Sequence, residues 1–93
     1  MDRSSVERVL QEYVDALESA SLRTLSRDRY EYQPHYGTAR NLLARWQGGE
    51  SEECLRAAVV GVLADYRTNP PPGSHAEVVG AAFGAVCRTV GVM

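Results

Sequence analysis

The sequence predicts an all-α protein with a compact four-helix arrangement, and three observations support this fold class. Apolar residues recur at three- and four-residue spacing through most of the 93-residue chain. Ser, Pro and Gly stand where these stripes begin and end. The composition, 44% hydrophobic and 24% charged, is ordinary for a globular protein. We expect a single helical domain, 1–93, with helices at about 4–20, 35–47, 51–68 and 74–91 and an irregular segment at about 26–34.

The first expected helix, about 4–20, has one continuous apolar face. Ser4 and Glu7 have the spacing of a reciprocal capping box. The opposite face is mildly acidic, as expected of a solvated surface. Residues 19–26 are rich in Ser and Thr, so the pattern leaves open whether the helix continues or breaks there. The apolar face consists of Val6, Val9, Leu10, Tyr13, Val14 and Leu17.

Residues 26–34 show no clear stripe and are expected to be irregular. Pro34 disfavours a helical conformation at Gln33 and suits the first turn of a new helix. Gly48 and Gly49 then mark the end of that helix, which we expect at 35–47. Its apolar stripe consists of Tyr36, Ala39, Leu42, Leu43 and Trp46.

The third expected helix, 51–68, is predicted to be the centre around which the others pack. Ser51 can cap it, Glu52 and Glu53 suit its first turn, and the prolines from Pro70 onward end it. Small apolar residues fill the sides that its main stripe leaves free. A helix that is apolar nearly all round is typical of a core.

The last expected helix, 74–91, begins with a predicted cap at Ser74 and carries two glycines four residues apart. Glycine inside a helix is unfavourable by about 1 kcal/mol relative to alanine, so Gly80 and Gly84 need a structural reason. We expect a close approach to a small face of the preceding helix, formed by Ala57, Gly61 and Ala64. The short turn between these two helices predicts that they pack as antiparallel neighbours. The buried stripe is predicted to consist of Val78, Val79, Ala82, Phe83, Val86 and Val90.

Charge and cysteine usage restrict the classes of function. The formal net charge is −2, so no overall positive field attracts nucleic acid or an anionic membrane. The apolar run from Val78 to Cys87 is too short to cross a bilayer, and the charged start of the chain does not resemble a signal peptide. We therefore expect a cytoplasmic protein with no membrane partner. Cys54 and Cys87 are expected to be reduced and buried.

No motif in the sequence predicts catalysis or cofactor binding. His35 and His75 have no neighbouring nucleophile or acid in a known arrangement, and the chain has no glycine-rich phosphate loop. The His and Cys residues also lack the spacing of a zinc site. We expect a protein that is not an enzyme and that uses neither a metal nor a cofactor.

Arginine and aromatic residues concentrate between residues 23 and 46, and this segment is the predicted binding site. Tyr, Trp and Arg are typical of energetically dominant positions in protein interfaces. We therefore predict a small non-enzymatic adaptor or regulator, with an inhibitor as one form, that contacts another protein; a homodimer remains open. The alternative is a nucleic-acid or anionic-ligand module, which the acidic remainder of the chain disfavours. The predicted partner-binding residues are Arg27, Arg29, Tyr30, Tyr32, His35, Arg40 and Arg45, and the alternative adds Arg23.

Overall fold

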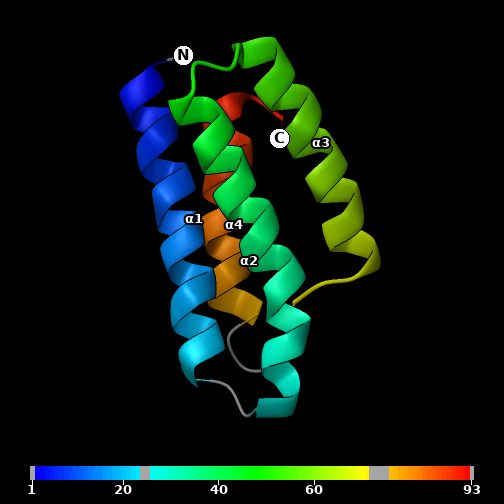
Figure 1. The fold of residues 1–93 in the computed structure, drawn as a ribbon. Helices are drawn as coiled ribbons and strands as arrows, with labels where there is room; N and C mark the ends of the chain where they lie inside the picture. Colours follow the sequence, from blue (N-terminus) through cyan, green and yellow to red (C-terminus); the bar gives the residue numbers. More distant parts are fainter. Residues whose placement is uncertain (1, 24–25, 72–75, 93) are drawn as a thin grey trace.

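The protein is all-helical, as predicted. The computed structural model describes residues 2–23, 26–71 and 76–92, without the side chains of residues 21–31. Within these ranges it contains four helices: α1 (Arg3–Arg23), α2 (Ser26–Gln47), α3 (Glu52–Thr68) and α4 (Ala76–Val90). Successive helices run in opposite directions (Figure 1). The first helix continues through residues 19–23, which resolves the alternative that the Ser- and Thr-rich stretch left open.

The central helix is α1, and the expectation that helix 51–68 forms the centre is wrong. α1 packs extensively on both α2 and α4, whereas α3 contacts those two helices much less and stands away from α1 (Figure 1). α1 buries large side chains such as Leu10, Tyr13 and Leu17, whereas α3 fully buries only Leu55 and Val59. Burial stabilises in proportion to the apolar area removed from water, and the Ala and Gly residues of α3 have little area to bury.

α2 begins at Ser26, so the predicted irregular segment at 26–34 is wrong. The helix passes through Pro34, although that residue lacks the N–H needed for a helical hydrogen bond. Tyr32 lies four residues before Tyr36 and extends the apolar stripe across the proline, and its side chain is 0% exposed. Burial of this large ring offsets part of the unfavourable effect of Pro34 on the helix.

Glycine ends α2 and α4 in the way the sequence predicts for α2. Gly49 and Gly91 adopt φ values of 98° and 79°, a left-handed conformation that glycine accepts without strain. The N–H of Glu50 donates to the carbonyl of Arg45, and that of Val92 donates to the carbonyl of Cys87. Both ends are therefore Schellman motifs, in which otherwise unpaired helix carbonyls accept hydrogen bonds.

The start of α1 differs from the predicted capping box of Ser4 and Glu7. α1 begins one residue earlier, and the Asp2 carboxylate accepts hydrogen bonds from the Ser5 hydroxyl at 2.8 Å and the Ser4 N–H at 3.3 Å. These bonds hold the pKa of Asp2 below its usual value. The predicted cap at Ser51 is confirmed, because its hydroxyl accepts from the Cys54 N–H. The predicted cap at Ser74 lies outside the described residues.

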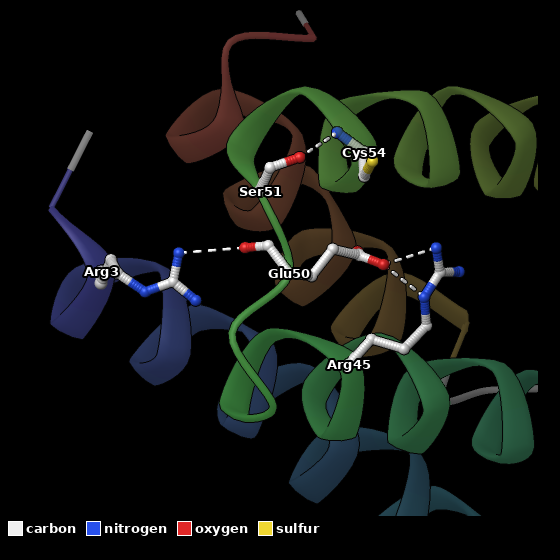
Figure 2. Close-up of polar contacts among 5 residues, drawn as sticks. All are labelled: Arg3, Arg45, Glu50, Ser51 and Cys54. Atoms are coloured by element: carbon white, nitrogen blue, oxygen red, sulfur yellow. Dashed lines mark hydrogen bonds and ion pairs between the residues drawn. The ribbon is translucent and has the colours of Figure 1, made fainter.

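The connection between α2 and α3 is fixed by contacts from both sides (Figure 2). Arg3 donates to the backbone carbonyl of Glu50 at 3.0 Å and to that of Trp46 at 2.8 Å. Arg45 donates from Nε to the Glu50 carboxylate at 2.5 Å and also forms an ion pair with it. The N-terminal end of α3 is therefore held to both α1 and α2.

The other end of α3 is held by an aromatic contact. The Tyr66 ring stacks on Phe83 with a centroid separation of 5.2 Å, and His35 meets its edge at 6.4 Å. Gly80 lies beside Tyr66, and a Cβ atom at Gly80 would stand 2.8 Å from the tyrosine hydroxyl. The space at Gly80 is thus filled by a side chain.

The predicted contact between two glycine-lined helix faces is wrong. A Cβ atom added at Gly61 would meet nothing within 4 Å. At Gly84 it would meet the end of the Arg88 side chain at 3.2 Å, from the same helix. α3 and α4 are therefore separated by side chains, and their backbones do not approach through Ala57, Gly61 and Ala64.

Two burial predictions for apolar residues are also wrong. Cys87 is buried as expected, but Cys54 is exposed in the first turn of α3. Val78 is 61% exposed and does not join the buried stripe of α4. In the described part of the chain, no helix is both long and apolar enough to cross a membrane.

Candidate binding groove between α2 and α3

The predicted binding residues lie in different environments of the structure. Tyr32 belongs to the core, so its side chain is not available on the surface of the folded chain. Arg27, Arg29 and Tyr30 lie on the first turns of α2, and their side chains are outside the described part of the structure.

The other predicted residues do not share one surface. Arg40 is exposed, stands 5.7 Å from the Tyr36 ring centroid, and lines a hollow between α1 and α2. Arg45 lies on the side of α2 that faces α3 and is paired with Glu50. His35 also faces α3, but it lines the other end of that side. The aromatic–arginine segment is therefore not a continuous binding surface in its described part.

Among the described residues, a groove between α2 and α3 is the candidate site that we consider. It consists of two hollows with volumes of about 560 Å³ and 310 Å³. Both hollows are lined by Pro34, Thr38, Val62 and Asp65, so they adjoin. We call them the wide hollow and the terminal hollow, because the second lies at the C-terminal end of α3, and together they form the α2–α3 groove. The wide hollow is also lined by Gly37, Asn41, Leu42, Arg45, Ala58 and Gly61, and the terminal hollow by His35, Tyr66, Thr68 and Asn69.

Two glycines explain why the wide hollow is open. Gly37 on α2 and Gly61 on α3 both line it, and a Cβ atom at either position would meet nothing within 4 Å. The apolar lining comes from Leu42, Ala58 and Val62, which also contact the protein core or belong to it. The groove therefore has apolar walls and room for additional side chains.

The charge in the groove is negative towards the C-terminal end of α3. Arg45 is neutralised by Glu50 at the far end, whereas Asp65 forms no ion pair with a described residue. The end of the α3 dipole adds partial negative charge near Asp65. Burial lowers the pKa of His35, so its imidazole is neutral at pH 7 and adds no compensating positive charge.

Two titratable groups of the core, Tyr13 and Cys87, are shifted towards their neutral forms. Burial is the main cause that raises the pKa of Tyr13, and its hydroxyl has no hydrogen-bond partner among the described residues. Burial likewise raises the pKa of the Cys87 thiol, which lowers its thiolate fraction. In the described ranges, no three His, Cys, Asp or Glu side chains gather as metal ligands would.

Sequence reasoning missed Gly37, Thr38, Asn41 and Asp65 as groove residues. Gly37 and Gly61 did carry a signal, because each interrupts a helix without ending it. These two glycines line one hollow only because of the way α3 packs beside α2. The sequence pattern predicted the packing of α3 wrongly.

Comparison with known proteins gives no relative for this chain. No protein-family model, curated protein or solved structure matches it. Function must therefore be inferred from the residues and the groove they form.

Proposed function

We propose that this protein is a small non-enzymatic adaptor or regulator that binds a segment of another protein in the α2–α3 groove. One observation carries the proposal: two adjoining hollows with partly apolar walls lie between α2 and α3, and Gly37 and Gly61 leave the wide hollow unfilled. Grooves between helices commonly receive the apolar side of a partner helix.

The dimensions of the groove suit side chains of a partner segment. Binding hollows typically have volumes of roughly 300–1,000 Å³, and both hollows fall in this range. Apolar side chains of the partner would enter beside Leu42 and Val62. The polar groups of Thr38 and Asn41 would be available to form hydrogen bonds with its backbone or side chains. Such a combination of apolar anchors and a polar rim is typical of protein interfaces.

The way α3 is held also supports binding in this groove. Its ends are fixed by the Glu50 connection and by Tyr66, while its middle turns contribute half-buried Ala58 and Val62 to the groove lining. A segment that entered the groove would cover these side chains further. Burial of apolar area would then stabilise the complex.

The nucleic-acid alternative receives no support from the described arginines. Arg40 and Arg45 line different hollows, and Arg45 is paired with an acid. A nucleic-acid site usually presents basic side chains along one surface. We therefore retain the protein-binding function alone.

The test is capture from native lysate with two variants at one glycine. Gly61→Phe places a ring in the wide hollow, whereas Gly61→Ala adds one methyl group and leaves most of the hollow open. Both replacements favour the helix over glycine, so neither should destabilise the fold. We expect the wild type and Gly61→Ala to capture the same partner and Gly61→Phe to lose it by about tenfold or more, the size of a lost interface hot spot.

Melting temperature and sedimentation of each variant provide the controls. Equal capture by all three proteins would refute binding in the groove, and so would capture of no protein by a wild type that sediments as a monomer. A wild-type dimer that Gly61→Phe converts to monomer would identify the bound segment as a second copy of the chain.

A further inference from the structure

We infer that the terminal hollow of the α2–α3 groove binds the ammonium or guanidinium group of a lysine or arginine in the partner segment. The inference rests on the proposed function and adds the chemistry of the ligand. It concerns the hollow of about 310 Å³ between His35, Asp65, Tyr66 and Asn69.

The charges that face this hollow favour a cation. Asp65 contributes a carboxylate without an ion pair to any described residue, and the described lining contains no arginine. The last carbonyls of α3 also lie at this end, where a helix carries partial negative charge. His35 is half-buried, and burial favours its neutral form.

The two threonine hydroxyl groups of the hollow act as acceptors. Thr38 uses its hydroxyl proton to donate to the Pro34 carbonyl at 2.8 Å, and Thr68 donates to the Ala64 carbonyl at 3.1 Å. Each oxygen then has lone pairs left but no proton to donate. Together with the Asp65 carboxylate, they suit a ligand rich in N–H donors, such as an ammonium or guanidinium group.

The apolar part of the hollow suits the carbon chain that carries such a group. Val62 and Pro34 line both hollows, and Tyr66 adds an aromatic wall. Lysine and arginine commonly bury their methylene groups along apolar surface while their charged ends meet polar groups. A basic side chain could thus extend from the wide hollow along Val62 to Asp65.

Three small probes with six carbon atoms each distinguish the contribution of charge to affinity from that of apolar burial. We would titrate the full chain with hexylammonium, 1-hexanol and hexanoate, and follow the backbone amide resonances of Gly37, Gly61 and Asn69. Hexylammonium should bind about fivefold more tightly than hexanol, as expected for one exposed ion pair aided by a helix dipole. Hexanoate should bind most weakly, and added salt should reduce the preference for the cation.

Asp65→Asn should lower the affinity for hexylammonium to that for hexanol. Glu12→Gln, which removes an exposed acid from α1, is the matched control and should change neither affinity. Equal binding of hexanol and hexylammonium to the wild type would overturn cation selection and leave the groove intact. No response of the groove resonances to any probe would overturn this inference, whereas the proposed function would still be judged by the glycine variants.

Discussion

α1 and α3 are both amphipathic helices, but they have opposite places in the fold. α1 contacts two helices through large buried side chains and exposes a charged face. α3 contacts the same two helices lightly, and its exposed side includes Ala57, Val60 and Ala64. The number of apolar residues in a helix therefore does not determine how deeply it is buried. The size of the side chains on one face is the better guide, because burial energy depends on area.

The largest expected effect is the difference in thiol reactivity between Cys87, in the core, and Cys54, on the exposed side of α3. Cys54 should react with a thiol reagent at the rate of an exposed thiol, whereas Cys87 should react only when the core opens. Stability of about 5 kcal/mol or more for a chain of this size implies protection by roughly four orders of magnitude. Labelling of Cys54→Ser and Cys87→Ala, each with one remaining thiol, measures the two rates. Similar native rates would show that α4 is not held in the core.

Leucine truncation compares the two helices directly. Leu17 on α1 is fully buried, and Leu17→Ala should reduce the free energy of unfolding by about 2–5 kcal/mol. Leu63 on α3 is half-buried, and Leu63→Ala should reduce it by about 1 kcal/mol, because less area and a smaller cavity are involved. Urea denaturation measures both. A larger loss at Leu63 would return α3 to the centre of the fold.

Replacing Gly61 or Gly80 with alanine should have a smaller effect on stability. The effect should differ between the two positions, because the space beside Gly61 is open and that beside Gly80 is filled. Gly61→Ala should stabilise the protein by about 1 kcal/mol, because α3 gains helix propensity and nothing obstructs the methyl group. At Gly80 the methyl group would meet the Tyr66 hydroxyl, so displacement of that ring should offset the gain. Denaturation midpoints compare the variants. An equal gain at both positions would mean that Tyr66 moves aside freely and does not hold α3.

Acidification should have the smallest effect on stability. This effect should be confined to the contacts that hold α3 to the rest of the protein. Burial lowers the folded-state pKa of His35, so its contribution to stability is present above the unfolded pKa of about 6.5 and is lost as pH falls through the lower folded pKa. Hydrogen exchange of α3 amides should therefore accelerate between pH 7.5 and 5.5 after correction for the intrinsic rate. His35→Gln should remove this acceleration, and an unchanged acceleration in that variant would assign it to other groups.

The sequence predicted the elements of the fold better than their arrangement. The stripe from Val6 to Leu17 and the stop at Gly48 and Gly49 depend on local periodicity and turn chemistry, and both are confirmed. The start of α2 was missed because Pro34 was weighed above Tyr32, although Tyr32 continues the stripe. Local propensity was outweighed there by burial of a ring in the core.

The candidate site was harder to predict from the sequence than the fold was. His35 and Arg45 were predicted as binding residues and do line the α2–α3 groove, but for Arg45 the charge is neutralised by Glu50. Asp65 belongs to no motif, and it becomes a groove residue only because α3 lies beside α2. Such a site depends on tertiary packing, which residue spacing along one helix does not contain.

Trp46 gives this protein an internal optical reporter. It is the single tryptophan of the chain, its indole donates to the Arg3 carbonyl at 3.0 Å, and the Arg3 guanidinium lies 3.6 Å from its ring centroid. Its fluorescence therefore reports the joint between the start of α1 and the end of α2. A ligand that enters the terminal hollow should leave this emission unchanged, whereas separation of α1 from α2 should shift it towards the spectrum of a hydrated indole. Separation of α1 from α2 can then be followed in the unlabelled protein without interference from ligand binding.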